Sequence, residues 1–302
     1  MQPFKVSSFY QFIDLSALSL EDLKVEIEHQ ACLVDLGGLI ILAQEGLNGT
    51  VCAPSEQLNS FLDYLRKSFG VENANIKYAE SEKAAFPRFK VRIRQEIVTT
   101  GVENPPSLFE RKGKSLTPEE WHQVLSSNED YALIDTRNWY ETDLGVFKSA
   151  IDPRLINFQQ FPDFVKNSGI NKNKKVLMYC TGGIRCEKAS LLMEDLGYEQ
   201  VYQLQGGILK YLEQYPQGHY EGECFVFDQR VAVDGNLLPT ERYSLCPHSG
   251  QPAEHWIECE NCGKQARVSV GCLNDPTMQT CSKNCANIVQ RKISKQVNIK
   301  AE

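Results

Sequence analysis

Cys180 is the residue whose type and surroundings most clearly indicate chemistry. It opens the run Cys180-Thr181-Gly182-Gly183-Ile184-Arg185-Cys186, which lies between the apolar stretch 175–179 and a helix-like segment, 184–196. A strand end, a glycine turn and a helix start direct backbone N–H groups and the positive end of a helix dipole at one sulfur. Such surroundings lower a thiol pKa and can hold a persulfide. We therefore expect Cys180 to be the catalytic nucleophile and Thr181, Gly182, Gly183, Ile184 and Arg185 to form its loop.

Arg185 and Cys186 in this run each allow two interpretations of their role. Arg185 either pairs with an acidic residue, such as Glu141, or lies beside an anionic substrate, and both readings place it near the site. Cys186 either resolves an oxidised Cys180 as a disulfide or packs against the sheet, and we favour packing. Gly182 and Gly183 are interpreted as positions where a side chain would crowd the backbone around the sulfur.

A second pair of charged residues is expected at the rim of the same site. Asp135 and Arg137 follow the apolar stretch 131–135, which predicts a neighbouring parallel strand. Sites in parallel sheets form at the carboxyl ends of strands, where Asp135 and Cys180 both lie. We expect Asp135 and Arg137 to form an ion pair that orders this rim.

The C-terminal part of the chain contains spaced cysteines that indicate a metal site. Cys259 and Cys262 form one pair, Cys281 and Cys285 form another, and 18 residues separate the pairs. This spacing is similar to that of zinc knuckles, so we expect structural zinc, which with four thiolates would not activate water. Cys246, His248 and Cys272 leave a substituted ligand or a second site open. The simpler alternative is a poorly ordered tail with reduced cysteines.

A cationic row alternates with apolar residues in the stretch 87–94. Strand periodicity places one set of side chains on one face and Phe89, Val91 and Ile93 on the other; the cationic set is Arg88, Lys90, Arg92 and Arg94. Either this face is simply solvated or it contacts the phosphates of RNA.

The first hundred residues predict a ferredoxin-like, acylphosphatase-like domain. The expected order is strand, helix, two strands, helix and strand, at residues 4–12, 20–30, 39–43, 50–53, 55–69 and 86–98. Gly46 and Gly49 fit a tight connection between the middle strands, where a positive φ is expected.

Two further regions follow. Residues 101–115 break both periodicities and predict a linker, and residues 116–218 alternate short apolar strands with helices, which predicts a parallel α/β sheet. Residues 219–302 are a cysteine-rich module with helical character near 285–295. The predicted fold class is thus a multidomain combination of α+β and α/β.

Composition limits the class of protein. The 302 residues carry a formal net charge of −7 and eleven cysteines. No apolar run reaches the roughly 20 residues of a membrane span, and the first residues lack the apolar core of a signal peptide, so we expect a cytoplasmic protein without a membrane partner. Its cysteines then indicate thiols, metal ligands or redox groups rather than disulfides. No flavin, haem or nicotinamide fingerprint is present, so no catalytic cofactor is evident.

Residues 116–215 resemble a rhodanese domain. The resemblance depends on three segments in the expected order: Ile134-Asp135-Thr136-Arg137 with Glu141 and Gly145, the loop from Cys180 to Arg185, and Leu204-Gln205-Gly206-Gly207-Ile208. Val146 and Phe147 stand where many rhodanese domains have a histidine after the glycine. That histidine does not carry the sulfur, so Cys180 remains the expected sulfur carrier.

A wider resemblance covers about residues 1–225. The segments 44–50, 90–101 and 181–188 are similar to those of the tRNA wobble-uridine hydroxylase family, TrhO. This resemblance implies oxygen-dependent conversion of the wobble uridine of tRNA to 5-hydroxyuridine. It also implies a persulfide-forming cysteine at Cys180, molecular oxygen as a substrate, and a persulfide or thiol donor as a partner besides tRNA.

Two other functions fit part of the sequence. The loop by itself would equally support a rhodanese-type sulfurtransferase that moves sulfane sulfur to a thiol acceptor. A non-catalytic interaction module is a third reading, against which the intact Cys180 and Arg185 argue.

Overall fold

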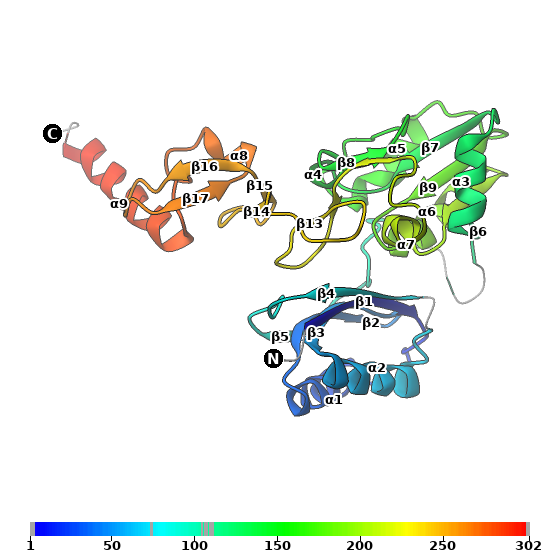
Figure 1. The fold of residues 1–302 in the computed structure, drawn as a ribbon, viewed down its shortest axis with the longest axis horizontal. Coiled ribbons are helices and arrows are strands. Elements are labelled where there is room, and N and C mark those ends of the chain that lie inside the picture. Colours follow the sequence, from blue (N-terminus) through cyan, green and yellow to red (C-terminus); the bar gives the residue numbers. More distant parts are fainter. Residues whose placement is uncertain (1–3, 73–74, 104, 106–107, 109–111, 300–302) are drawn as a thin grey trace. The chain divides into compact units, whose positions relative to one another are not determined.

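An antiparallel sheet with one added parallel strand forms the N-terminal part of the chain (Figure 1). The computed structural model describes residues 4–72, 75–103, 105, 108 and 112–299. The elements of this part are β1 (Phe4–Phe12), α1 (Leu20–Leu33), β2 (Gly37–Ala43), β3 (Gly46–Pro54), α2 (Ser55–Phe69), β4 (Ile76–Ser81) and β5 (Phe89–Ile93). The two helices cover one face of the sheet, and the apolar side chains of that face form one buried core. This confirms the ferredoxin-like, acylphosphatase-like prediction.

The strand order β4-β1-β3-β2-β5 differs in detail from the prediction. The fourth strand of the ferredoxin-like pattern is β4, which pairs antiparallel with β1 and was not predicted. The stretch expected as a strand over 86–98 forms only β5, an additional edge strand parallel to β2. The sequence of β4 mixes charged and apolar residues without clear alternation, so only its pairing with β1 identifies it as a strand.

The two glycines of the segment 44–50 have different roles. Gly46 begins β3 with a φ of 133°, and a Cβ there would lie 2.0 Å from the carbonyl oxygen of Gln11. Gly49 lies inside β3, where a Cβ would lie 2.9 Å from Ile40 Cγ1 and 3.0 Å from Phe9 Cζ. The predicted turn role therefore holds for Gly46 and is wrong for Gly49, which allows close packing in the core.

A parallel sheet in the order β6-β10-β9-β7 forms the next part. Apolar side chains form a buried cluster on each face of this sheet. The elements are β6 (Lys114–Leu116), α3 (Pro118–Ser126), β7 (Tyr131–Asp135), α4 (Trp139–Thr142), β8 (Gly145–Phe147), η2 (Phe158–Gln160), α5 (Phe161–Asn167), β9 (Lys175–Tyr179), α6 (Ile184–Asp195), β10 (Val201–Leu204), α7 (Gly207–Gln214), β11 (Tyr220–Gly222) and β12 (Cys224–Phe225). The predicted parallel α/β arrangement is confirmed.

The parallel α/β part begins earlier and ends later in the chain than the predicted bounds of residues 116 and 218. Residues 114 and 115, placed in the linker, form strand β6 together with Leu116, and this strand pairs with β10. Strand β11 pairs with β8, and Tyr220, Cys224 and Val226 enter the same buried cluster as Trp121. The boundary expected after residue 218 therefore falls inside the α/β part, because residues 220–226 pack against its buried core.

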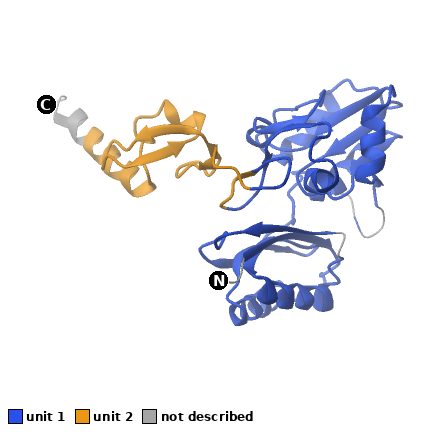
Figure 2. Ribbon diagram, in the orientation of Figure 1, with its two compact units in different colours: residues 1–228, 233–238 blue, residues 229–232, 239–302 orange. Residues whose placement is uncertain are grey.

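The chain divides into two units (Figure 2). The first comprises Met1–Asp228 with Val233–Leu238, and the second comprises Gln229–Ala232 with Pro239–Glu302. The remaining elements are β13 (Ala232–Val233), β14 (Ser244–Leu245), β15 (Pro252–Ala253), β16 (His255–Glu258), β17 (Gln265–Val268), α8 (Val270–Leu273) and α9 (Lys283–Ile299). Among the residues described, no helix combines the length and apolar character that a membrane crossing needs.

A buried lysine joins the N-terminal sheet to the parallel α/β part. Lys188, on α6, is completely buried, and its Nζ lies 2.7 Å from Glu45 Oε1 and 2.5 Å from Glu96 Oε2. It also donates to the backbone oxygen of Val98 at 3.0 Å. A buried ammonium requires such partners, because its desolvation is otherwise uncompensated.

We expect the substitution Lys188→Met to lower the free energy of unfolding by about 3–5 kcal/mol, since it leaves two carboxylates without their cation. Urea unfolding measures the change. Lys210→Met is the matched control, because Lys210 pairs with Glu213 on the surface and such pairs contribute about 0–1 kcal/mol. Equal unfolding free energies for the two variants would contradict the role given to Lys188.

Candidate active site

Cys180 lies directly after β9, and backbone N–H groups of the following turn surround its sulfur. The side chain is 1% exposed, and the N–H of Gly183 donates to Sγ at 3.1 Å. Burial alone would raise the thiol pKa, but hydrogen bonds from Cys186 and the backbone, together with the charge of Arg185, lower the pKa of Cys180 to about 5. The sulfur is therefore held as a thiolate at neutral pH.

Glycines at two turns shape this loop. Gly183 has a φ of 101°, and Gly206 and Gly207 have φ values of 74° and 70°. A Cβ at Gly207 would lie 2.6 Å from the carbonyl oxygens of both Cys180 and Thr181, and the N–H of Ile208 donates to the Cys180 oxygen at 2.9 Å. Nothing lies within 4 Å of a Cβ at Gly182, so the predicted crowding is wrong there.

Arg185 pairs with Glu141 by two parallel hydrogen bonds. Nη1 donates to Oε1 at 2.6 Å and Nη2 donates to Oε2 at 2.7 Å, with both side chains buried. Burial would raise the pKa of Glu141, but the Arg185 charge outweighs it and the pKa falls. Thr181 Oγ1 also lies 3.4 Å from Glu141. Of the two interpretations of Arg185, the structure shows the ion pair. Through this pair, buried Glu141 orients the loop that carries Arg185.

Asp135 and Arg137 form the expected ion pair, but in the interior. Arg137 Nη2 lies 2.7 Å from Asp135 Oδ2, and both side chains are completely buried. Arg137 also donates to the backbone oxygen of Gly145 at 2.6 Å and to Tyr220 Oη at 3.3 Å. The rim position predicted for this pair is therefore wrong. The pair ties the end of β7 to β8 and β11 instead.

Cys186 is completely buried in the first turn of α6, as the packing reading expected. Its Sγ lies 3.6 Å from Thr136 Oγ1. Burial and the neighbouring Cys180 raise the pKa of Cys186, so the shared proton stays with Cys186. Half-buried Ile184 begins helix α6, which carries Cys186 and follows the loop of Cys180.

The cationic residues lie on the sheet face opposite the N-terminal core. The strand covers only 89–93, so Lys90 and Arg92 alternate within β5 while Arg88 and Arg94 flank it. Strand register places one row of residues on this face, Tyr10, Asn48, Ile41 and Arg92. Arg88, Arg92 and Arg94 are exposed and Lys90 is half-buried.

Three residues of the site were not found from the sequence. Tyr10 Oη donates to Glu187 Oε1 at 3.2 Å, and this bond links the N-terminal sheet to α6. Lys77, on β4, is 6% exposed, and its Nζ lies 4.9 Å from the centroid of the Tyr10 ring. Burial lowers the pKa of Lys77 to about 8, although the Cys180 and Glu187 charges oppose that shift. No local pattern marks these residues, because the contacts join distant segments.

The four cysteines chosen from their spacing lie together in the second unit. Every pair of Sγ atoms in the set Cys259, Cys262, Cys281 and Cys285 is within 4.8 Å. The Cys262–Cys281 separation is 3.6 Å, Cys281–Cys285 is 3.8 Å, and Cys262–Cys285 is 3.9 Å. Tetrahedral zinc with bonds of about 2.3 Å requires sulfur separations of about 3.8 Å. The sulfur positions therefore fit zinc.

The other candidate ligands lie apart from this set. Cys246 Sγ is 3.7 Å from Cys272 Sγ, and both side chains are buried. His248 Nε2 lies 2.8 Å from the backbone oxygen of Thr280. None of the three joins the four-cysteine group in the part of the chain that the structure describes.

Comparison with known proteins gives three family matches. The UPF0176 acylphosphatase like domain matches residues 4–97, the Rhodanese-like domain matches 117–214, and the Rhodanase C-terminal model matches 221–286. A tRNA uridine(34) hydroxylase of Bdellovibrio bacteriovorus is 44% identical over 94% of this chain and 81% of its own length. The chain belongs to the tRNA uridine(34) hydroxylase family.

Other members of this family are similar over most of their length. The tRNA uridine(34) hydroxylase of Legionella pneumophila is 45% identical over 78% of this chain and 93% of its own length. That of Wolbachia pipientis from Culex pipiens is 37% identical over 98% of this chain and 99% of its own. In the present member, the segments 44–50, 90–101 and 181–188 meet at Lys188 through Glu45 and Glu96.

We expect carbamidomethylation of Cys180 by iodoacetamide to keep its rate as the pH falls from about 8 to 6 and to slow only below about 5, since the thiolate reacts. Mass spectrometry of the Cys180 peptide measures the rate. Cys186→Ala removes a hydrogen bond to the sulfur and should move the inflection to higher pH. The unfolded protein, with an ordinary thiol pKa near ~8.5, is the reference, and coinciding profiles for folded and unfolded protein would contradict a stabilised thiolate.

Proposed function

We propose that this protein hydroxylates the wobble uridine of tRNA to 5-hydroxyuridine, with molecular oxygen as a substrate and Cys180 as the catalytic residue. The observation that carries this proposal is the similarity to tRNA uridine(34) hydroxylases over 94% of the chain, including the N-terminal domain. The contacts of Lys188 and Tyr10 support it, because they attach that domain to the Cys180 loop. A plain sulfurtransferase would need only the rhodanese part.

The site supports a defined division of roles. The backbone N–H groups and the Arg185 charge stabilise a sulfur anion on Cys180. This suits a persulfide formed when the Cys180 thiolate takes the outer sulfur of a donor persulfide and the donor leaves as its thiolate. Arg185 makes two hydrogen bonds to Glu141, so its proposed role is to orient the Cys180 loop. We also propose that the reaction takes place in the cytoplasm, because the proposed substrate is tRNA.

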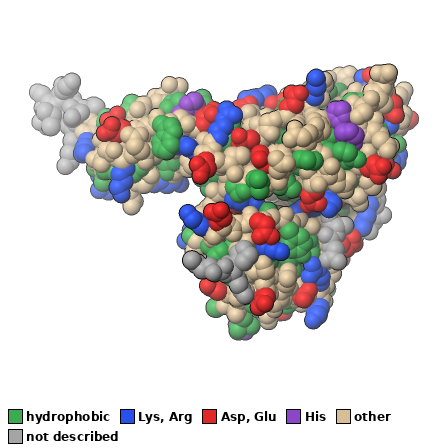
Figure 3. All heavy atoms as spheres, viewed as in Figure 1, with side chains coloured by type: hydrophobic (Ala, Val, Ile, Leu, Met, Phe, Trp, Pro, Cys, Tyr) green, Lys and Arg blue, Asp and Glu red, His purple; other side chains and the backbone are tan. Residues whose placement is uncertain are grey.

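We also propose that the cationic residues bind phosphates of the anticodon arm. Acidic and basic side chains are interspersed on the face drawn in Figure 3, so a polyanion needs a local group of cations. Arg88, Lys90, Arg92 and Arg94 form such a group, and no carboxylate pairs with them among the described residues. Arg92 shares a sheet face with Tyr10, and three strand spacings, about 14 Å, separate them. We therefore propose phosphate contacts on the same sheet face as Tyr10, whose hydroxyl contacts Glu187 on the helix that follows the Cys180 loop.

A third proposal concerns zinc in the second unit. The four thiolates of Cys259, Cys262, Cys281 and Cys285 would fill all tetrahedral positions, so the metal would order the turns that carry them and take no part in oxygen chemistry.

Deletion of the gene should remove 5-hydroxyuridine and its derivatives from tRNA, and wild-type complementation should restore them. Complementation with Cys180→Ser should not, because the serine hydroxyl stays protonated and holds no persulfide. Cys32→Ser is the control, since Cys32 is exposed on α1. Nucleoside mass spectrometry of purified tRNA measures the outcome. Unchanged 5-hydroxyuridine in the deletion strain would overturn the proposed function.

Purified wild-type protein should contain one zinc per chain by inductively coupled plasma mass spectrometry. Cys259→Ala should lose most of it, because three thiolates leave the tetrahedral site open. Cys32→Ala should retain it. A wild-type protein without zinc, or a Cys259→Ala variant that keeps it, would refute the zinc proposal.

A further inference from the structure

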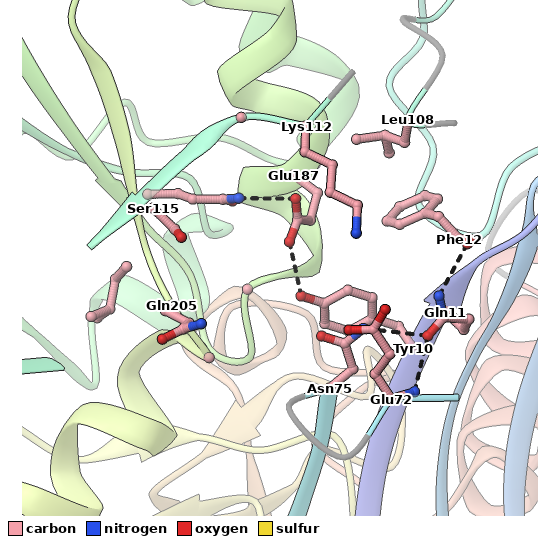
Figure 4. Close-up of a pocket in the computed structure, with 15 residues that line it drawn as sticks. Tyr10, Gln11, Phe12, Glu72, Asn75, Leu108, Lys112, Ser115, Glu187 and Gln205 are labelled. Atoms are coloured by element: carbon pink, nitrogen blue, oxygen red, sulfur yellow. Dashed lines mark hydrogen bonds between the residues drawn. The ribbon is translucent and has the colours of Figure 1, made fainter. Parts of the chain in front are cut away.

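A pocket of about 190 Å³ lies beside the Cys180 loop (Figure 4). Strand β1, the segment before β6, helix α6 and strand β10 contribute to its lining, with Tyr10, Phe12, Lys112, Gly183, Glu187 and Gln203 as the residues of interest. Pockets for drug-sized ligands occupy about 300–1,000 Å³, so this one suits a smaller group such as a single base.

The pocket is adjacent to the reactive sulfur. Gly183 lines it, and the N–H of the same residue donates to Cys180 Sγ at 3.1 Å. A Cβ at Gly183 would lie 3.2 Å from Tyr10 Oη, a tight contact, and the φ of 101° also favours glycine there. A group held in this pocket is therefore separated from the sulfur by one glycine turn.

One edge of the pocket consists of hydrogen-bond acceptors. Glu187 Oε1 accepts from Tyr10 Oη at 3.2 Å, and Glu187 Oε2 accepts from Gln203 Nε2 at 2.9 Å, so two donors orient the carboxylate. Because the carboxylate engages the amide nitrogen, Gln203 presents its Oε1 elsewhere. That oxygen is buried without a hydrogen-bond partner among the described residues, and the side chain is 4% exposed. The two oriented oxygens of Glu187 therefore form the acceptor edge of the pocket.

The rest of the pocket lining includes two aromatic side chains and a lysine. Tyr10 and Phe12 place their rings 6.0 Å apart in an edge-to-face arrangement along β1. Lys112 extends into the pocket between Glu187 and Phe12 (Figure 4). An aromatic wall, an acceptor edge and a nearby ammonium suit a flat group that has an N–H next to a carbonyl.

We propose that this pocket binds a pyrimidine base whose imino N–H donates to the acceptor edge of Glu187 and whose adjacent carbonyl accepts from Lys112. Gln203 is a positioning residue that orients Glu187. The inference rests on the proposed function, for which the base is the uracil of the target nucleotide, unstacked from a single-stranded loop. Uracil carries an N–H between two carbonyls and meets both requirements.

The test compares anticodon stem-loop RNAs that differ only at position 34, with uridine or 3-methyluridine, because the methyl group removes the imino N–H. Fluorescence anisotropy at one fixed salt concentration gives the two dissociation constants. Wild-type protein should prefer uridine by about tenfold or more. Glu187→Met should reduce this preference to near unity. Glu199→Met, which removes an equal charge at an exposed position outside the pocket, should keep it.

Lys112→Met provides a second variant at an exposed position, where loss of folding is not expected. It should weaken binding of the uridine stem-loop by about tenfold, and thermal unfolding should match wild type. A wild-type protein that does not distinguish the two RNAs, or a folded Glu187→Met variant with full preference, would overturn the pocket assignment. Binding needs neither oxygen nor turnover, so these outcomes are separate from the loss of 5-hydroxyuridine that tests the proposed function.

Discussion

The interaction on which the rest of this structure depends is the buried ammonium of Lys188 between Glu45 and Glu96. A buried charge is stable only where opposite charges and hydrogen bonds replace its water. Its two carboxylates come from the β2–β3 turn and from the segment after β5, whereas Lys188 lies on the helix that begins at the Cys180 loop. One cation therefore holds the N-terminal sheet against the catalytic helix.

The arginines of the α/β part closest to the Cys180 loop are engaged in buried ion pairs. Arg185 and Arg137, the arginines nearest the loop in sequence and in the sheet, are bound to Glu141 and Asp135 in the interior. On the N-terminal sheet, exposed Arg92 shares a face with Tyr10, and no carboxylate pairs with it among the described residues. A rhodanese loop alone stabilises a sulfur anion. The added sheet converts that loop into one wall of a larger site.

The cysteines divide into groups with separate physical roles. Cys180 and Cys186 share one proton beside a helix start, and the unequal surroundings give the thiolate to Cys180. The four cysteines of the second unit have sulfur separations that suit tetrahedral coordination. Hydrogen bonds to its sulfur favour the thiolate of Cys180, whereas the second group is distinguished by the close approach of its four sulfur atoms.

The sequence by itself determined the features that depend on neighbours along the chain. These include the Cys180 loop, the parallel α/β order and the spacing of the four cysteines. Glycines, caps and apolar periodicity act within a few residues, so local patterns reveal them.

Only the tertiary structure decided features that join distant segments. These include the pairing of β4 with β1, the packing role of Gly49, the ion pair of Arg185 with Glu141, and the Tyr10–Glu187 contact, which spans 177 positions. Strand register and burial select such partners, and no local pattern encodes either one.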